Sequence, residues 1–465
     1  MRRNQDDTAE HESIRQRDLA ERDVEYVLHQ YTNLKHHEAK GPLIIERGEG
    51  VYVYDDRGDR YLEAMAGLWS VALGFNEPRL VDAAVRQLRR LPYYHNFAHR
   101  SHRPLIELAE QLVEMAPVPM SKAYFANSGS EANDSAIKMI WYRSNALGMP
   151  QKKKLISRYR SYHGVTLGAA SLTGLSANHH SFDLPIDRFL HLGCPHFWRE
   201  GLPGESEQDF ATRMAAELEA LIVREGPDTI AAFFAEPLMG AGGVIVPPRT
   251  YWAKVQAVLR RYDILLVADE VICGFGRTGR MFGSQTFDIE PDIMVLSKQL
   301  SSSYMPISAL LINRCVMEPI TEESGRVGVF GHGFTAGGHP VAAAVAQESI
   351  RIIVERNLVE HAATVGAYMQ SRLRELEGHD LVGEVRGVGL IGAIELVTDK
   401  AARRGGNPPG QLGLLVNRLM LQRRVMVRNI LDTIAFCPPL IVSCEQIDTI
   451  MEALRAALDE ALSIV

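Results

Sequence analysis

Cysteine is scarce in this sequence, and its few copies are not spaced like metal ligands or like the partners of a disulfide framework. The chain of 465 residues has five cysteines, and no two of them form a CxxC pattern. They are Cys194, Cys273, Cys315, Cys437 and Cys444. An odd number of widely spaced cysteines is typical of a reducing compartment. The charged first 23 residues also lack the apolar core of a signal peptide, so the sequence predicts a cytoplasmic protein.

Excess positive charge and long apolar runs are missing as well. The 50 basic residues face 57 acidic ones, which leaves no surplus of positive charge to neutralise nucleic acid or an acidic membrane surface. The most apolar window, 229–248, is interrupted by Glu236, Pro237 and several glycines, which predicts a buried strand and a loop rather than a membrane span. With 46% hydrophobic and 23% charged residues, the composition is that of a globular protein. We therefore expect small-molecule chemistry, with no nucleic-acid or membrane partner.

Short apolar runs alternate with helical patterns between residues 120 and 345. The runs cover 122–126, 154–157, 229–235, 264–268, 293–296 and 307–312. Runs of this kind are typical of strands buried on both faces, and their alternation with helices predicts a mainly parallel α/β sheet.

The pattern changes on both sides of this region. Residues 51–61 predict a hairpin near the start of the ordered chain. After Pro340 a long Ala/Val/Ile helix is predicted to reach about residue 356, followed by strands near 390–397 and 434–442. Ser443 and Gln446 have capping-box spacing ahead of a final amphipathic helix. These elements predict a second, smaller α+β unit.

The first candidate site is the segment 127–133, NSGSEAN, where a predicted strand meets a predicted helix. Backbone amides at a helix start, together with the Ser128 and Ser130 hydroxyls, can bind one phosphate, and Gly129 allows close approach. Simple helix capping by Ser128 or Ser130 explains the same residues.

Two further candidates follow apolar strands directly. Asp269 and Glu270 end the run 264–268, where an acid can hold a metal, a sugar hydroxyl or a protonated ring nitrogen, or can cap a turn. Lys298 follows the run 293–296. Burial there lowers the pKa of an amine and makes it a nucleophile for a carbonyl, although a solvated lysine is the open alternative.

Two other patterns carry less information. The segment 274–279, GFGRTG, satisfies GxGxxG, but it does not follow its strand directly and no apolar helix follows it, so we do not expect a dinucleotide site. His95, His99 and His102 lack an accompanying carboxylate or cysteine cluster, so we expect surface or pocket histidines rather than a metal site.

Eight ordered segments of the chain resemble the class III, or ω-, aminotransferases, which depend on pyridoxal 5′-phosphate. They are GLWSVALG (67–74), NSGSEAN (127–133), SRYRSYHG (157–164), AEPLMGAGGVIVPP (235–248), LLVADEVICGFGRTGRMFG (265–283), SKQLSSSYMPISA (297–309), GHGFTAGGHP (331–340) and VRNILDTIAFCPPL (427–440). The resemblance implies the type I fold of these transferases, with a mainly parallel seven-stranded sheet. It assigns 1–79 to an N-terminal segment joining the small domain, 80–343 to the large cofactor-binding domain and 344–465 to the C-terminal small domain.

The resemblance also implies roles for single residues. Lys298 would form a Schiff base with the cofactor and move the substrate proton, and Asp269 would keep the pyridinium nitrogen protonated so that the ring accepts electrons. The other implied cofactor contacts are Ser128, Gly129 and Ser130 at the phosphate, Tyr162 and Val271 on the two ring faces, Glu236, and Thr335 from the neighbouring subunit. The family forms homodimers with shared active sites, and such dimers can pair into tetramers.

The implied substrate-binding residues are Trp69, Phe97, Tyr162 and Arg428. A guanidinium suits the carboxylate of a pyruvate-like keto acceptor, although a surface arginine is the open alternative. The resemblance thus implies transfer of an amino group from a primary amine or ω-amino acid to pyruvate, in two half-reactions. Decarboxylation of a dialkyl amino acid or an aminomutase reaction on the same scaffold stays open, as does a binding protein without turnover.

The sequence departs from the family pattern around the cofactor entrance. Gln299, Ser303 and Ser308 stand where relatives often have glycine, and Ala336 stands where an aromatic residue is usual. We hypothesise that Ala336 leaves room for a bulky amine, so that Ala336→Tyr should slow large amines more than small ones. Unchanged rates with both would contradict the hypothesis.

Overall fold

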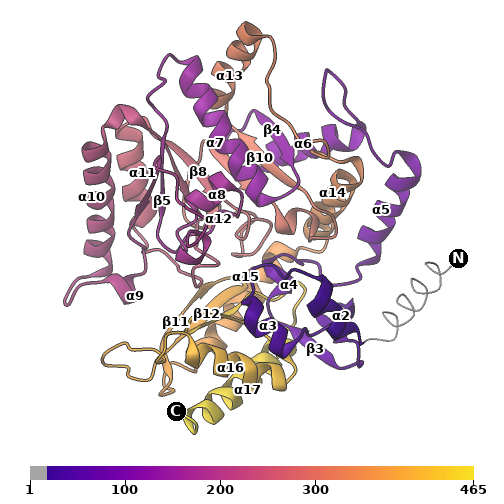
Figure 1. Cartoon of the computed structure of the whole chain (residues 1–465), viewed down its shortest axis with the longest axis vertical. Coiled ribbons are helices and arrows are strands. Elements are labelled where there is room, and N and C mark those ends of the chain that lie inside the picture. The colour runs from indigo at the N-terminus through magenta and orange to yellow at the C-terminus, as the bar shows by residue number, and fades with distance from the viewer. Residues whose placement is uncertain (1–17) are drawn as a thin grey trace, which may run out of the picture.

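The computed structural model describes residues 18–465, which form a large half and a smaller half beside it (Figure 1). A seven-stranded sheet in the order β4-β10-β9-β8-β7-β5-β6 forms the centre of the large half. Its strands are β4 (Lys122–Ala126), β5 (Lys154–Arg158), β6 (Phe189–Leu192), β7 (Ile230–Ala235), β8 (Leu265–Asp269), β9 (Ile293–Leu296) and β10 (Ser308–Ile312). The six predicted strands are all present, and the predicted mainly parallel sheet is confirmed.

Strand β10 is the exception to the parallel arrangement, because it runs antiparallel to both β4 and β9. The pairings among the other strands are parallel. A fully apolar run has the same composition in either direction, so the direction of β10 could not be predicted. Strand β6 was not predicted, since its four residues include His191 and have no long apolar run.

Helices cover both faces of the large sheet. They are α5 (Pro78–Arg90), α6 (Arg103–Met115), α7 (Gly129–Ala146), α8 (Leu167–Leu172), α9 (Phe197–Glu200), α10 (Glu207–Glu225), α11 (Tyr251–Arg261), α12 (Gly283–Thr286), α13 (Arg314–Val327) and α14 (Pro340–Glu355). Phe233 and Phe234 are neighbours on β7 and both are fully buried, but they belong to two different apolar clusters. The Phe233 cluster includes Trp252 of α11, and the Phe234 cluster includes Ile140 of α7. Successive side chains of β7 therefore pack on opposite helical layers.

The smaller half is built mainly from the C-terminal residues. Its antiparallel sheet has the order β11-β12-β15-β14, with β11 (Val382–Val388), β12 (Ile391–Leu396), β14 (Arg428–Ile430) and β15 (Thr433–Phe436). Its helices are α15 (Leu358–Arg374), α16 (Gln411–Gln422) and α17 (Cys444–Leu462). The capping box of Ser443 and Gln446 is confirmed. The predicted strand 434–442 was too long, because Pro438 and Pro439 cannot donate ladder hydrogen bonds.

The N-terminal segment packs on the smaller half, as Figure 1 shows in indigo. It contains α2 (Leu19–Tyr26), α3 (Leu34–Lys40), β1 (Ile45–Glu49), β2 (Tyr52–Asp55), β3 (Arg60–Glu63) and α4 (Ala66–Trp69). Strands β2 and β3 confirm the predicted hairpin, and β3 pairs in parallel with β13 (Val425–Met426) near the other end of the chain. The predicted domain boundaries stay predictions, and residues 1–17 of the first domain lie outside the described residues. Within 18–465, none of the helices has the length and apolar character needed to cross a bilayer.

Candidate active site

A cavity of about 130 Å³ lies where strands of the large sheet end. Strands β4, β5, β7, β8 and β9 run in one direction, so their carboxyl ends meet at one edge, where open α/β sheets place their functional sites. The predicted site residues that line this cavity are Gly129, Ser130, Tyr162, Glu236, Asp269, Val271 and Lys298. The fold thus gathers side chains from segments that are far apart in the sequence.

The first turn of α7 forms one wall of the cavity. Ser128 is the N-cap, and its Oγ accepts a hydrogen bond of 3.2 Å from the Glu131 backbone N–H, so the capping interpretation of Ser128 is confirmed. The other amides of this turn have no acceptor within the helix and give it a positive end. A Cβ on Gly129 would lie 3.3 Å from Val271 Cγ2, which explains why the smallest residue stands here. The turn is therefore suited to bind an anion, and capping does not exclude this.

Asp269 is held in one orientation by three donors. Its Oδ2 accepts from His163 Nδ1 at 2.8 Å and from Asn133 Nδ2 at 3.0 Å, and its Oδ1 accepts from the Val271 backbone N–H at 3.2 Å. The carboxylate is only 3% exposed. Among residues 18–465, the two side-chain clusters that could hold a metal do not include Asp269. The metal interpretation therefore loses support, and a carboxylate fixed in this way suits a protonated ring nitrogen.

Glu270, the second acid of the pair, has a structural role. Its carboxylate accepts hydrogen bonds from the Gly283 and Ser284 backbone N–H groups at the start of α12. It therefore caps a helix outside the cavity, whereas Asp269 faces the cavity.

Lys298 lies in the cavity wall rather than in solvent. It lies two residues after the end of β9 and has a φ of 45°, a left-handed conformation that is uncommon for residues other than glycine. Burial lowers the pKa of its amine, and the negative charges of Asp269 and Glu236 oppose that shift in part. A lowered pKa increases the fraction of neutral, nucleophilic amine, so the solvated alternative is wrong.

Glu236 organises the turns around the cavity. Its Oε1 accepts from the Tyr162 backbone N–H at 3.1 Å, and its Oε2 accepts from the Gly240 backbone N–H at 2.8 Å. Burial raises the pKa of this carboxyl, which is 3% exposed. Glu236 thus fixes the backbone of Tyr162, whose side chain forms another part of the cavity wall.

Arg428 and Trp69 lie near the cavity but are not among the residues that line it. Arg428 begins β14 and is half-buried; burial lowers the pKa of its guanidinium, which still acts electrostatically on Lys298 and Tyr162. Among the described residues, no carboxylate forms an ion pair with Arg428. Trp69 is 2% exposed and belongs to the same apolar cluster as Ile272, which lines the cavity. The surface alternative for Arg428 is therefore wrong.

Thr335 and Phe97 do not line the cavity of this chain. Both are exposed, and a Cβ on Gly333 would lie 2.8 Å from the Phe97 ring, so the two segments contact each other. Tyr93 Oη donates a hydrogen bond of 2.9 Å to the Thr335 carbonyl, which connects them further. Their predicted roles in a neighbouring subunit and in substrate binding stay predictions.

Three residues near the site were given no role from the sequence. His163 and Asn133 lie within motifs that were recognised, but only the structure shows that both bind Asp269. Tyr31 lies in no motif. Its pKa is raised by burial and lowered in part by Arg428, so it stands close to the substrate side of the site.

The departures from the family pattern are partly explained. Gln299 is fully buried, and its Nε2 donates to the carbonyl of Ile272 at 2.8 Å, which connects the residue after Lys298 to the cavity wall. Ser303 keeps a left-handed φ of 58°, a conformation that glycine would adopt without strain. Ser308 is fully buried on β10, and Ala336 is half-buried.

The GFGRTG segment has a structural role. Arg277 is fully buried, and its Nη1 donates to the carbonyls of Leu390 at 2.9 Å and Pro438 at 2.5 Å. The segment therefore fastens the smaller half to the large half.

Of the three histidines considered above, His102 caps α6 by accepting from the Leu105 backbone N–H.

Three observations indicate that the cavity can bind pyridoxal phosphate. A helix start built from small residues can hold the phosphate, the fixed Asp269 carboxylate can hold the ring nitrogen, and the Lys298 amine can react with the aldehyde. Two buried polar atoms of the wall, His163 Nε2 and Asn133 Oδ1, have no partner within residues 18–465. Such atoms usually find partners, so water or a ligand near this wall is expected.

Comparisons with known proteins agree with this geometry. The aminotransferase class-III family matches residues 34–458. Gamma aminobutyrate transaminase 1, mitochondrial, of Solanum lycopersicum is 51% identical over 420 residues, which are 90% of this chain and 82% of that protein. Gamma-aminobutyrate transaminase 1, mitochondrial, of Oryza sativa subsp. japonica is 49% identical over 418 residues, 90% of this chain and 81% of that protein.

Solved structures are similar over nearly the whole chain. The omega transaminase from Pseudomonas jessenii in complex with PMP is 59% identical, covers 97% of this chain and 99% of its own, and superposes with a TM-score of 0.96. A structure described as a transaminase with L-ala is 66% identical, covers 90% of this chain and 99% of its own, and has a TM-score of 0.90. With the matched family and the site geometry, these similarities show that the chain belongs to the class III aminotransferases and is a pyridoxal-phosphate-dependent transaminase of fold type I.

Proposed function

We propose that this enzyme moves an amino group from a primary amine or ω-amino acid to pyruvate. The observation that carries the proposal is Arg428, a half-buried guanidinium that acts electrostatically on Lys298 and forms no ion pair with a described residue. A guanidinium in this position favours a carboxylate on one of the two substrates. Similar proteins are named as gamma-aminobutyrate transaminases and omega transaminases, which supports an ω-amino acid or an amine as the donor.

Each residue of the cavity has a defined task in such a reaction. Pyridoxal phosphate, when bound, supplies an electron sink for the reacting carbon of the substrate. The first turn of α7 would hold its phosphate, Asp269 would hold the proton of its ring nitrogen, and Tyr162 and Val271 would enclose its ring. The Lys298 amine would take the proton from the substrate carbon and deliver it to the reacting carbon of the cofactor, because burial keeps its pKa below the usual range.

The donor and the acceptor can be identified with a small substrate panel. The cofactor-loaded enzyme is given 1-phenylethylamine, γ-aminobutyrate or L-alanine as donor, with pyruvate or 2-oxoglutarate as acceptor, and the keto products are quantified. We expect turnover with an amine or ω-amino acid and pyruvate, with alanine as co-product. Release of carbon dioxide or of an isomerised amine, without a keto product, would support the decarboxylase or aminomutase alternative.

Replacing Arg428 should separate substrates by charge. Loss of a hydrogen-bonded charged group costs about 1.5–3 kcal/mol, so Arg428→Ala should raise KM for pyruvate by about 10- to 150-fold. The half-reaction with a carboxylate-free amine should change little. Arg418→Ala, at an exposed arginine of α16, is the matched control. Equal losses for charged and uncharged substrates would show that Arg428 does not bind the carboxylate.

Replacing Gly164 tests the phosphate site. Gly164 has a φ of 127°, and a Cβ there would lie 2.4 Å from Ser130 Oγ and 2.8 Å from Ser130 Cα. Gly164→Ala should therefore displace the first turn of α7, lower stability by about 1–3 kcal/mol and weaken cofactor binding. Gly148→Ala is the control, because Gly148 has a φ of 71° with nothing within 4 Å. Thermal unfolding and cofactor titration measure both effects, and unchanged cofactor affinity would contradict the phosphate assignment.

We further propose a homodimer in which Thr335 and Phe97 complete the neighbouring active site. Both are exposed in the single chain and neither lines its own cavity, which supports this arrangement. Mixed dimers of a Lys298→Ala chain and a Thr335→Ala chain should contain one site carrying both substitutions and one carrying neither, so activity should exceed that of either parent. A cytoplasmic location is proposed on the cysteine content alone.

A further inference from the structure

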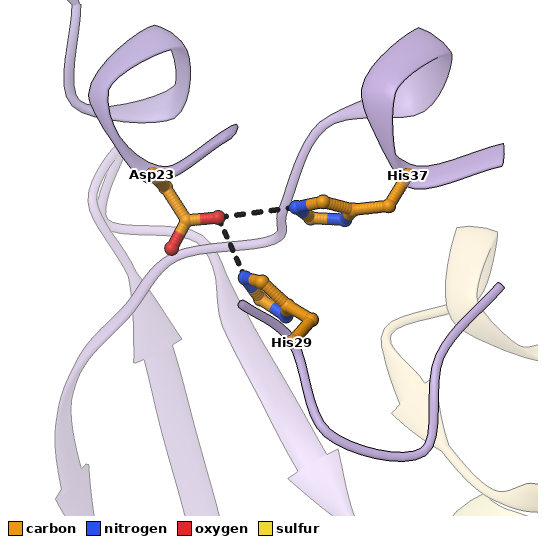
Figure 2. Close-up of side chains that lie close together, drawn as sticks. All are labelled: Asp23, His29 and His37. Carbon is orange, nitrogen blue, oxygen red and sulfur yellow. Dashed lines mark hydrogen bonds and ion pairs between the residues drawn. The ribbon is translucent and has the colours of Figure 1, made fainter. Parts of the chain in front are cut away.

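Three side chains of the N-terminal segment converge on one point. Asp23 comes from α2, His37 comes from α3, and His29 comes from the loop between these helices, as Figure 2 shows. His29 Nε2 lies 2.7 Å and His37 Nε2 lies 3.2 Å from the same atom, Asp23 Oδ2. The three ligand atoms all lie within 4.8 Å of one another. Two imidazole nitrogens and a carboxylate oxygen thus face a common centre.

This arrangement has the donor set and the spacing of a transition-metal site. Ligand atoms bound tetrahedrally at about 2.0–2.1 Å lie about 3.4 Å apart. The observed separations of 2.7 and 3.2 Å therefore need to open by about 0.7 and about 0.2 Å. The two imidazole rings have centroids 4.0 Å apart and an interplanar angle of 35°, so they present their nitrogens from one side. Two imidazole ligands favour Zn²⁺ over Mg²⁺ or Ca²⁺, and Zn²⁺ also accepts a carboxylate oxygen.

A second cluster in the chain shows why the charge around the ligands matters. His196, Glu384 and Glu395 also come together, but Arg386 forms ion pairs of 2.6 Å with Glu384 and 2.8 Å with Glu395, and Arg199 forms another with Glu395. These guanidinium groups neutralise the carboxylates and repel a cation. In the part of the chain from residue 18 onward, the ion-pair partners of Asp23 are His29 and His37 only. The Asp23 cluster can therefore accept a divalent ion.

Solvent can reach this cluster, and the loop that it holds reaches the active site. The Asp23, His29 and His37 side chains are 23%, 29% and 10% exposed, so an ion can enter and water can complete its coordination. Two residues after His29, Tyr31 has a φ of 53°, and its Oη donates a hydrogen bond of 2.7 Å to Asn178 Oδ1 of the large half. The charge of Arg428 acts on Tyr31, and Tyr31 in turn acts on Tyr162. Fixing His29 therefore fixes a loop beside the substrate side of the cavity.

We propose that Asp23, His29 and His37 bind one divalent transition-metal ion of the zinc class, and that the ion holds the Tyr31 loop in place beside the active site. The ion is structural: it binds α2, the loop and α3 to one another and takes no part in amino transfer.

Metal binding can be measured without any assay of amino transfer. The cofactor-loaded enzyme is freed of metal with a chelator and titrated with Zn²⁺ by calorimetry and with Co²⁺ by visible absorption. We expect one tight site per chain, with an affinity that falls at least tenfold in His37→Gln and in His29→Gln. His36→Gln is the matched control, because His36 is the exposed neighbour of His37 on α3 and is outside the cluster. Absence of a tight site, or equal losses in His36→Gln and His37→Gln, would overturn the proposal.

Amide hydrogen exchange of the N-terminal segment gives an independent measurement of whether the ion holds the Tyr31 loop. Addition of Zn²⁺ should slow amide hydrogen exchange within residues 23–40 of the wild-type enzyme and of His36→Gln, but not of His37→Gln. Thermal unfolding of the metal-free proteins identifies any variant that is misfolded, and Asp23→Asn then replaces it in the comparison. If exchange in this segment does not respond to Zn²⁺, the ion does not fix the loop, whichever substrates the enzyme proves to use.

Discussion

Lys298→Ala is expected to lower kcat by about 10⁴-fold, the upper range for loss of a positioned acid–base group. The substituted chain keeps the walls of the cavity, because Asp269 and Glu236 are held by hydrogen bonds that do not involve Lys298. Cofactor should therefore still bind, although no longer covalently. Steady-state rates measure the loss of activity. Passage through a desalting column under native and under denaturing conditions shows whether the cofactor is bound, and whether it is bound covalently.

Chemical rescue distinguishes a missing amine from a damaged fold. A small primary amine such as methylamine can enter the space left by the lysine side chain and move the proton in its place, so added methylamine should restore part of the rate of Lys298→Ala. Rescue should decline for amines larger than the deleted side chain. Lys254→Ala, at a half-buried lysine of α11 whose Nζ donates to Thr212 Oγ1, should keep full activity and show no response to added amine. If methylamine does not increase the rate of Lys298→Ala, the assignment of Lys298 as the proton carrier is wrong.

Asp269→Asn is expected to lower kcat by about 10²- to 10³-fold, the usual effect of losing one charge-stabilising group in an active site. Asparagine keeps the size of the side chain but not its charge, so the ring nitrogen of the cofactor loses the partner that keeps it protonated. The new side-chain amide has one oxygen in place of two, so its NH₂ group can face His163 or Asn133. That donor then loses its acceptor. Steady-state rates in both half-reactions measure the loss.

The same substitution should shift the titration of Lys298. The negative charge of Asp269 raises the pKa of the Lys298 amine, against the larger lowering by burial. Removing that charge should lower the pKa further, so cofactor-free Asp269→Asn should combine covalently with pyridoxal phosphate down to a lower pH than the wild type. Glu270→Gln is the contrast, since Glu270 caps α12 through Gly283 and Ser284, and its loss should reduce thermal stability instead. An unshifted pH profile in Asp269→Asn would show that the two groups are not coupled.

The local order of the large sheet could be predicted well from the sequence. Apolar runs such as 230–235 are bounded by residues that cannot continue a buried strand, so β7 and its neighbours have clear ends. Strand direction and order depend on contacts between distant segments, and so the reversal of β10 and the pairing of β3 with β13 had no local signal. In the C-terminal sheet, β11 mixes Glu384 and Arg386 with valines, and these buried or half-buried charges concealed the strand.

The candidate site could be predicted in part for the same reason. Lys298 and Asp269 stand at strand ends, where the direction of the chain alone brings them to one edge of the sheet. His163 approaches Asp269 only through the turn after β5, and Tyr31 reaches the site only through the packing of α2 and α3. Interactions of this kind depend on tertiary packing, and no spacing in the sequence indicates them.

The pairing of β3 with β13 has a consequence for the order in which the newly made chain folds. Leu62 is synthesised before the large half, but its partner Val425 is synthesised only after the whole large half. Until then the hairpin of β2 and β3 presents an open edge, which is the kind of surface on which unfinished chains aggregate. The large half can fold during synthesis, whereas the N-terminal segment, with its loop beside the active site, must wait for β13. Synthesis of β13, rather than translation of the catalytic lysine, therefore sets the moment at which the fold of this chain can become complete.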